Sequence, residues 1–478
     1  MNVVDTTSPA FKDNARQALA DKQLQKALTA VAPGLAARRG AARAALPEFE
    51  ALRERGRDIK NHTLDHLDVY LEMFEAKAKA AGSHVHFAPT PQDAREIILD
   101  ICKSVNAKVV TKGKSMISEE VGLNHFLEEA GLTVAETDLG EYLIQIRGET
   151  PSHIIAPAIH LTQEQLEQDF RRLHTQLPEN RVLTEPQQLV SEARAVLRAR
   201  FLEADVGITG ANFMIAETGS TVIVTNEGNG DLTQSLPKVH IVIASIEKLV
   251  PTLDDVGTLL RLLARSATGQ EISTYTTFST GPRRKEDPDG PEQCHIVILD
   301  NGRSQLLGTD FREVLSCIRC GACMNHCPVY GAIGGHAYGW VYPGPIGSVL
   351  TPALIGVKSS GHLPNASTFC GRCEAVCPMK IPLPGLMRKW REEEFKGGGT
   401  PAMFGLCLKL WAMLAKRPRL YHAATRLGIT ALSGWSFGRG KFRSLPFAGG
   451  WTKHRDMPAP QKGTFQALWA EHKAGVPR

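Results

Sequence analysis

The feature that most constrains this chain is a run of four closely spaced cysteines, Cys317, Cys320, Cys323 and Cys327, followed directly by Pro328. The spacing C-x2-C-x2-C-x3-C-P is typical of bacterial iron–sulfur proteins. A tightly turning chain with this spacing brings three thiolates together around a group of irons. The fourth cysteine is carried away by the proline and can reach a second cluster. The run therefore predicts one iron–sulfur cluster and indicates another.

A second, shorter run supplies three more cysteines within residues 370–378. When the two Cys-Pro pairs are aligned, Ser367 stands in the position that matches Cys317. If the last cysteine of each run crosses over, we expect cluster 1 to be bound by Cys317, Cys320, Cys323 and Cys377. Cluster 2 is then left with Cys327, Cys370 and Cys373. Three thiolates can hold a three-iron cluster, or a four-iron cluster with an open iron or a non-cysteine ligand such as Ser367.

Two other uses of these cysteines fit the spacing less well. Structural zinc sites usually separate two C-x2-C pairs or combine them with histidines, whereas the first run is continuous. Disulfide frameworks are typical of small secreted domains, and a chain of 478 residues does not need one. The predicted cofactors are therefore two iron–sulfur clusters, most simply two [4Fe-4S] clusters. Arg319, Arg372 and Lys380 would offset the negative charge of thiolate-bound clusters and tend to raise their potential.

The length of the chain, 478 residues, predicts two or three domains. Hydrophobic residues make up 42% of it and charged residues 22%, which is the composition of a soluble globular protein. The N-terminal stretch is charged and lacks the apolar segment of a secretory signal. No run reaches the roughly twenty apolar residues of a membrane-spanning helix. With reduced cysteines, this favours a cytoplasmic location and leaves room for a peripheral contact at the inner face of the membrane.

The N-terminal segment, residues 1–60, is rich in alanine and arginine, which predicts helices with a break at Pro33-Gly34. A longer helix is expected over residues 64–78, where apolar residues recur at helical spacing. His62 and His66 lie four residues apart and could share a metal ion. Because no third ligand is evident, ordinary solvent-exposed histidines are the simpler interpretation.

Strand-like and helical runs then alternate, which predicts an α/β domain with a largely parallel sheet over residues 61–303. The strand-like runs are residues 84–87, 108–111, 132–136, 143–146, 153–157, 204–209, 221–225, 240–244 and 295–299. The helical runs between them are residues 91–105, 118–129, 162–173, 186–200 and 253–264.

Glycine-rich turns in this domain are a candidate ligand site. They are Gly207-Ile-Thr-Gly-Ala-Asn212, Glu217-Thr-Gly-Ser220 and Asn226-Glu-Gly-Asn-Gly230. Glycines at strand ends let backbone amides approach an anion or nucleotide, but tight turns between buried strands explain them equally well. None forms a dinucleotide-binding or Walker loop, so no nucleotide is specified. Lys112-Gly-Lys-Ser115, before a helix expected to be capped around Ser118, is another candidate rim of such a pocket.

Residues 304–395 are expected to form an α-helical, ferredoxin-like domain that holds both clusters. A loop rich in proline and glycine, residues 342–348, joins its two cysteine runs. The three cysteines outside these runs, Cys102, Cys294 and Cys407, are interpreted as buried apolar residues.

A basic extension, residues 396–478, completes the predicted domain order. Residues 395–455 contain eleven lysines and arginines and no acidic residue, although the whole chain has a net charge of only +5. A stretch whose charges are all positive indicates contact with a negatively charged surface, either an acidic partner or a membrane face. No nucleic-acid motif accompanies it. The apolar segment 402–414 is too short to span a bilayer. It is expected to dock as a helix on the cluster domain or a partner, or to lie on a membrane surface.

These motifs together resemble the lactate-utilization protein B family. They are the E-T-G-S and N-E-G-N turns, the first cysteine run with C-P-V-Y, the loop Y-P-G-P-I-G, and the second run ending in C-P-x-K-I-x-L-P. The resemblance covers residues 60–390 well and the basic extension loosely. It implies an α/β domain similar to the lactate-utilization domain, with a fold like that of sugar-phosphate isomerases and CoA transferases. The second run of only three cysteines fits the family pattern.

The resemblance implies an iron–sulfur subunit of a three-part system that oxidises L-lactate to pyruvate and permits growth on lactate. Its partners would be a cysteine-rich subunit and a subunit that carries only the α/β domain, while the electron acceptor stays open. The absence of a flavin or nicotinamide loop favours an electron-transfer subunit without catalytic residues. The alternatives are a chain that itself oxidises lactate, or another 2-hydroxy acid such as glycolate, in its α/β domain, and a nucleic-acid-binding regulator.

Overall fold

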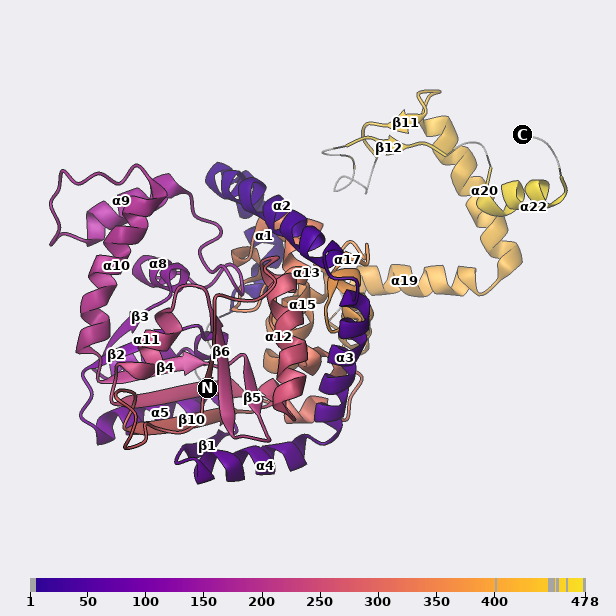
Figure 1. Ribbon diagram of the computed structural model, residues 1–478. Coiled ribbons are helices and arrows are strands. Elements are labelled where there is room, and N and C mark those ends of the chain that lie inside the picture. Colours follow the sequence, from indigo (N-terminus) through magenta and orange to yellow (C-terminus); the bar gives the residue numbers. More distant parts are fainter. Residues whose placement is uncertain (1–5, 400–401, 446–451, 453–454, 461–462, 476–478) are drawn as a thin grey trace. The chain divides into compact units, whose positions relative to one another are not determined.

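The computed structural model describes residues 6–399, 402–445, 452, 455–460 and 463–475. The chain forms two compact units, residues 1–393 and residues 394–478. The first unit contains a parallel sheet with its helices, and the short helices that carry both cysteine runs (Figure 1). The prediction of an α/β domain followed by a helical cluster segment is confirmed.

Six parallel strands form the main sheet, in the spatial order β1-β10-β7-β4-β2-β3. The strands are β1 (His84–Ala88), β2 (Val109–Gly113), β3 (Thr133–Glu136), β4 (Val206–Gly210), β7 (Val239–Ser245) and β10 (Gln293–Leu299). Ile296 of β10, for example, lies opposite Val242 of β7. Parallel neighbours need crossover connections, and helices supply them. These helices are α5 (Pro91–Ser104), α6 (Met116–Glu120), α7 (Leu123–Glu129), α8 (Leu139–Arg147), α9 (Gln163–Leu173), α10 (Pro186–Glu203), α11 (Asn229–Ser235) and α12 (Leu253–Ala267).

Strand β7 lies in the interior of the sheet, and every one of its residues is buried. Val239, Ile241 and Ile243 pack into a core that also contains residues of α5 and α7. Val242 and Ala244 pack into a larger core on the opposite face of the sheet. A continuous run of apolar residues is expected for a parallel strand that is covered on both faces.

A smaller sheet of four strands, in the order β8-β5-β6-β9, contributes to the larger core together with α12. Its strands are β5 (Phe213–Ile215), β6 (Ser220–Thr225), β8 (Leu249–Val250) and β9 (Tyr275–Ser279). β5 pairs antiparallel with β6 and parallel with β8. Only β6 was predicted: β5 and β8 are too short to show alternation, and the five-residue β9 was missed as well.

Two predicted strands are wrong. Residues 143–146 belong to α8, whose N-cap Asp138 accepts a hydrogen bond from the Gly140 amide at 3.2 Å. Residues 153–157 form a loop instead of a strand. Just before this loop, the Ser152 carbonyl accepts a hydrogen bond from the Tyr330 hydroxyl at 2.8 Å. The loop is therefore held by contacts with the cluster segment and not by a neighbouring strand.

The N-terminal helices also differ in detail from the prediction. They are α1 (Phe11–Ala20), α2 (Lys22–Ala44), α3 (Phe49–Asp65) and α4 (Leu67–Ala80), after a 3-10 turn at Ser8–Ala10. The break expected at Pro33-Gly34 is absent from α2, which packs against α12, α13 and α14. The single helix expected over residues 64–78 is divided at His66, whose φ of −128° leaves the helical region. Local sequence signals therefore predicted one break that is absent and missed another that is present.

Short helices make up the cluster segment. They are 3-10 turns at Ser304–Leu306, Arg312–Ser316, His336–Tyr338 and Leu363–Asn365, with α13 (Ala322–Asn325), α14 (Pro328–Ile333), α15 (Gly344–Ile355), α16 (Val357–Ser360), α17 (Arg372–Val376) and α18 (Leu383–Lys396). Trp390 fixes α18 to this segment, because its ring stacks on Phe311 with centroids 3.8 Å apart. Its indole nitrogen donates to the Val349 carbonyl at 3.0 Å.

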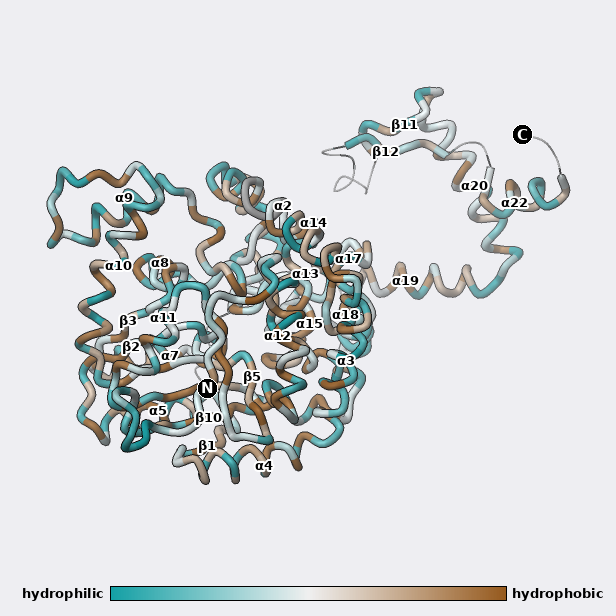
Figure 2. Tube along the Cα trace, in the orientation of Figure 1, coloured by the Kyte–Doolittle hydropathy of each residue, from teal (hydrophilic) through white to brown (hydrophobic). Residues whose placement is uncertain are grey.

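The second unit contains α19 (Ala402–Ala415), α20 (Pro418–Trp435), β11 (Lys441–Phe442), β12 (Met457–Pro458) and α22 (Phe465–Lys473). Hydrophobic residues recur along α19 (Figure 2), yet none of its described residues is buried. Cys407 on α19 is exposed, so its predicted burial is wrong, whereas Cys102 and Cys294 are buried as predicted. Lys453 of the predicted basic stretch lies outside the described residues. Among those residues, none of the helices is both long and apolar enough to cross a bilayer.

Candidate iron–sulfur centres and an adjoining cavity

The two cysteine runs share one backbone geometry. In Arg319–Gly321, the residues on either side of Cys320 have φ values of +59° and +72°. In Phe369–Gly371, the residues on either side of Cys370 have φ values of +54° and +77°. Positive φ is uncommon for residues other than glycine, so this agreement identifies two turns of one kind. Each turn leads into a short helix, α13 or α17, that carries the next cysteine of its run.

The first cavity is lined by four cysteines from both runs: Cys317, Cys320, Cys323 and Cys377. Apolar side chains, including Ile154, Ile346 and Met379, form much of its remaining wall. The backbone amide of Arg319 donates to the Cys317 sulfur at 3.4 Å. The structure thus brings together the four cysteines that the sequence assigns to cluster 1, including the one that crosses over from the second run.

The second cavity is lined by the other three cysteines, Cys327, Cys370 and Cys373. Ser367 lines it as well, and its hydroxyl accepts a hydrogen bond from the Phe369 amide at 3.1 Å. Ser367 therefore caps the turn and lines the same cavity as the three cysteines. Cys373 is buried but Cys370 is exposed, so this second cavity reaches the protein surface.

The chemistry of the donor set fits iron–sulfur clusters. Burial, and then the neighbouring Cys377, raises the pKa of Cys320 to about 12. Burial, and then Cys327, raises the pKa of Cys373 to about 12, and burial raises that of Cys377 to about 11. Buried thiols that approach one another this closely resist ionisation. Positively charged irons between them would remove that cost, because a coordinating thiol is deprotonated outright.

Two arginines of the N-terminal helices hold the end of the second run. Arg53 of α3 is buried, and its Nη2 donates to the Cys377 carbonyl at 2.6 Å and to the Ala375 carbonyl at 3.1 Å. Arg39 of α2 donates to the Val376 carbonyl at 2.7 Å. These contacts hold the loop in the position that places Cys377 in the wall of the first cavity. Sequence analysis missed both arginines, because they lie more than three hundred residues before the carbonyls they bind.

A buried chain of ion pairs connects the cluster segment to the α/β sheet. Arg303 is fully buried and donates to both carboxylate oxygens of Glu120, at 2.8 and 2.6 Å. It also forms an ion pair with Glu247 at 3.0 Å, and Glu247 in turn pairs with Arg319 at 3.0 Å. The Tyr342 hydroxyl donates to Glu120 at 2.6 Å. Arg319, the residue that sequence analysis expected to offset cluster charge, is thus the end of a charged chain that begins at α6.

A neighbouring cavity lies at the carboxyl ends of β2, β4 and β7 and has a volume of about 200 Å³. Its lining includes Ser115, Ala211 and Ile243, which lie at or just beyond these strand ends. Ile154 and Arg319 line both this cavity and the first cysteine cavity, so the two share a wall. Lys248 is another lining residue; burial, and then the nearby Arg319, lowers its pKa to about 8.

Only some of the residues that the sequence suggested as the rim of a ligand pocket line this cavity. Lys114, Asn212 and Asn226 line it, whereas Lys112 is fully buried and pairs with Glu119 at 2.9 Å. The turn at 217–220 does not line it. Gly210 allows a close approach of two loops, because an added Cβ would lie 2.4 Å from the Lys114 carbonyl oxygen. The helix after Lys112 is capped by Ser115, whose hydroxyl accepts from the Ser118 amide at 3.1 Å; the expected cap around Ser118 is therefore wrong.

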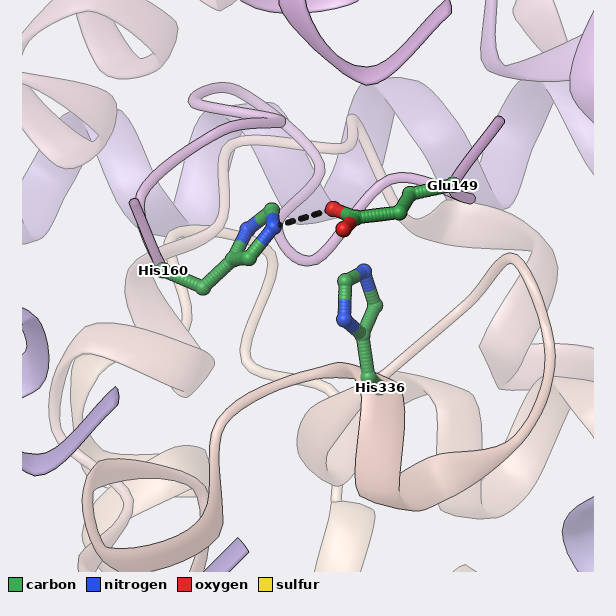
Figure 3. A group of neighbouring side chains, drawn as sticks. All are labelled: Glu149, His160 and His336. Atoms are coloured by element: carbon green, nitrogen blue, oxygen red, sulfur yellow. Dashed lines mark hydrogen bonds and ion pairs between the residues drawn. The ribbon is translucent and has the colours of Figure 1, made fainter. Parts of the chain in front are cut away.

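Glu149, His160 and His336 form a polar group outside both cysteine cavities (Figure 3). Their ligand-type atoms lie within 4.8 Å of one another, and His160 donates to Glu149 at 2.7 Å. Arg147 also pairs with Glu149 at 2.9 Å, and His336 donates to the Thr150 carbonyl at 2.7 Å. Burial raises the pKa of Glu149, but the hydrogen bonds from His160 and Arg147 outweigh it and lower that pKa to about 2. The group joins the loop before α9 to the cluster segment.

The remaining charged candidates lie at the surface. His62 and His66 are exposed, with ring centroids 4.6 Å apart, and the His62 ring nitrogen is 2.9 Å from the Tyr70 hydroxyl. Lys380 pairs with Glu54 of α3. The His62–His66 pair does not belong to any group of three potential metal ligands within the described part of the chain.

Comparison with known protein families gives three matches that together cover most of the chain. The model of the LUD domain matches residues 71–299. That of the 4Fe-4S dicluster domain matches residues 313–381, which contain both cysteine runs. A third, described as "Lactate utilisation protein B, C-terminal", matches residues 387–474. The dicluster match confirms the prediction of iron–sulfur clusters.

Curated relatives match over almost their whole length. A lactate utilization protein B from Bacillus cytotoxicus is 42% identical over 467 residues, which cover 97% of this chain and 98% of the relative. One from Bacillus cereus strain AH820 is 41% identical with the same coverage. A solved structure of a DUF162 family protein from Deinococcus radiodurans is 15% identical and covers 49% of this chain and 98% of that protein. Its TM-score of 0.26 is too low for a comparison of folds.

Proposed function

The chain belongs to the lactate utilization protein B family, and we propose that it is the electron-transfer subunit of a complex that oxidises L-lactate to pyruvate. A role in lactate utilization follows from the family. The observation that best supports electron transfer is the division of seven cysteines between two neighbouring cavities, with Cys370 of the second cavity exposed at the protein surface. A bound iron–sulfur cluster accepts and donates single electrons.

The protein's own residues would give the two centres different tasks. Cys317, Cys320, Cys323 and Cys377 would hold cluster 1 in the first cavity, beside the buried Arg319. Cys327, Cys370 and Cys373 would hold cluster 2, and the exposed Cys370 would bring it within reach of a partner. Cys323 and Cys373, one from each cavity, are near enough for their charges to interact. This arrangement supports a route from the interior of the protein to its surface.

The isolated chain is expected to show no useful L-lactate oxidation, because its sequence has no evident flavin or nicotinamide loop to take two electrons from the substrate. Activity should appear when a cysteine-rich subunit and a subunit with only the α/β domain are added. The measurement is L-lactate-dependent dye reduction by anaerobically purified protein, with and without these partners. A chain lacking Cys370 and Cys373 serves as the control that cannot complete the second centre. Robust activity of the single chain would instead support substrate oxidation in its own α/β domain.

We also propose that the basic extension, residues 396–478, docks on an acidic surface of a partner subunit in the cytoplasm. The eleven basic residues of 395–455 support this, as does the absence of acidic residues from that stretch. Exposed charges are screened over about 8 Å at physiological salt, so docking should weaken as salt rises. The exposed apolar residues of α19 would supply the part of the contact that salt does not weaken.

Truncation after Glu393 is expected to leave the iron content unchanged and to weaken subunit docking. The reason is that residues 394–478 form a separate compact unit whose only cysteine is Cys407. The measurement is pull-down of the partner subunits across a salt series, with liposome flotation in parallel. A full-length variant with Arg417, Arg419 and Arg426 changed to glutamine isolates the charge contribution. Loss of iron, or unchanged docking at every salt concentration, would contradict the proposal.

A further inference from the structure

The cavity at the carboxyl ends of β2, β4 and β7 has the position and size of a small-molecule site. In parallel α/β sheets, ligands bind in the crevice outside the carboxyl ends of the strands. The volume of about 200 Å³ lies below the roughly 300–1,000 Å³ of pockets for drug-sized ligands, so a small metabolite would fit. Apolar side chains at Ile154, Ile155, Leu263, Ala264 and Ala267 would cover a short hydrocarbon part of such a ligand.

Positive charge gathers on the wall next to the first cysteine cavity. Lys248 lines the cavity and is only 7% exposed, and its ammonium has no hydrogen-bond or ion-pair partner within the described part of the chain. Arg319 is also 7% exposed; its Nη2 binds Glu247, while Nε and Nη1 are buried without a hydrogen-bond partner. Buried charges and donors of this kind are costly unless something pairs with them.

The charges around this wall do not balance. Four cations, Lys60, Lys248, Arg303 and Arg319, are buried there with two acids, Glu120 and Glu247. The four thiolates of the first cysteine cavity, together with the irons they would bind, carry enough net negative charge to offset this difference overall. Lys248, however, lines the other cavity; its charge interacts with that of Glu247, but among the described residues no carboxylate forms an ion pair with its ammonium. An anionic ligand would complete this wall.

Another part of the lining limits how much negative charge a ligand can carry. It contains Asp138, Glu141 and Glu227, and its one lysine, Lys114, is already paired with Asp138 and, at 3.1 Å, with Glu227. A doubly charged phosphate would meet these acids, whereas a single carboxylate could lie against the cationic wall alone. A planar guanidinium is also well matched to a carboxylate.

We propose that this cavity binds a small organic monocarboxylate, whose carboxylate pairs with Lys248 and Arg319 beside cluster 1. Since Ile154 and Arg319 form the wall between the two cavities, the ligand would change the charge environment of cluster 1 without touching it. The α/β domain is then a ligand-binding module directly next to the redox centre, a role that electron transfer by itself does not require.

Calorimetry on the anaerobically purified full-length chain tests the proposal, with L-lactate, pyruvate, acetate and inorganic phosphate as separate probes. We expect saturable binding of one molecule of at least one carboxylate, and much weaker binding of phosphate. Lys248→Met should weaken carboxylate binding roughly tenfold or more, the usual effect of losing a hydrogen bond to a charged group. Lys238→Met is the matched control, because Lys238 is exposed and directly precedes the opposite, amino end of β7. The affinity of the Lys238→Met variant for the carboxylate should equal that of the unaltered chain.

The electron paramagnetic resonance spectrum of the reduced protein supplies a second readout. A saturating carboxylate should shift the cluster 1 signal in the unaltered chain and in Lys238→Met, but not in Lys248→Met. If Lys248→Met does not fold, Lys248→Gln removes the charge and keeps a hydrogen-bond donor. Absence of carboxylate binding, tighter binding of phosphate than of every carboxylate, or unchanged affinity in the Lys248 variants would overturn the proposal. None of these outcomes bears on electron transfer, which subunit reconstitution tests separately.

Discussion

Serine in place of Cys377 is expected to remove cluster 1, the cluster of the first cysteine run, although Cys377 belongs to the second run. Its thiol lines the first cavity together with Cys317, Cys320 and Cys323. The anaerobically purified chain should contain about seven or eight irons with matching sulfide, because the seven cysteines of the two runs divide four and three between the cavities. Cys377→Ser should lose about half of that iron, as Cys317→Ser should.

The complementary variant is Cys370→Ser, which should lose the iron of cluster 2 and keep the spectroscopic signal of cluster 1. Iron and sulfide analysis and electron paramagnetic resonance of each reduced variant are the measurements. Cys407→Ser is the matched control, since Cys407 is exposed on α19 and lines neither cysteine cavity. If the spectrum left by Cys377→Ser equals that left by Cys370→Ser, the crossed assignment is wrong. Zinc in place of iron would contradict both assignments.

Methionine in place of Arg303 is expected to destabilise the first unit severely. Arg303 is fully buried and holds Glu120 through two hydrogen bonds and Glu247 through an ion pair. Methionine is similar in length, but it would leave two carboxylates buried without their main partner. Breaking a buried ion pair in this way typically costs about 3–5 kcal/mol of the free energy of unfolding. The midpoint of anaerobic thermal unfolding should fall accordingly, and cluster 1 should be incorporated less well, because the same chain of charges ends at Arg319.

Arg283→Met is the matched control for this effect. Arg283 also forms an ion pair, with Glu292 at 3.0 Å, but the two side chains are 42% and 48% exposed. Exposed pairs of this kind contribute about 0–1 kcal/mol, because water solvates the partner that is left behind. A midpoint change in Arg303→Met no larger than that in Arg283→Met would mean that the buried chain of charges does not hold the two segments together.

The sequence alone determined the features that depend on residues near one another in the chain. The spacing of the first cysteine run predicted iron–sulfur clusters, which the dicluster family match confirms. The alternation of strand-like and helical runs predicted the largely parallel sheet, of which β7 is a fully buried strand. Where a local pattern was ambiguous the prediction failed, and residues 143–146 became part of α8 behind the cap at Asp138.

Only the tertiary structure decided how distant segments combine. Glu120 and Arg303 are 183 positions apart, and nothing in the sequence near either residue indicates a partner. Lys248 was not among the predicted site residues, because its position beside Arg319 depends on the packing of the sheet against the cluster segment. Spacing along the chain sets what a turn of a few residues can hold. Buried charges, in contrast, are paired by whichever elements the folded core brings together, and so the wall between the two cavities became visible only in three dimensions.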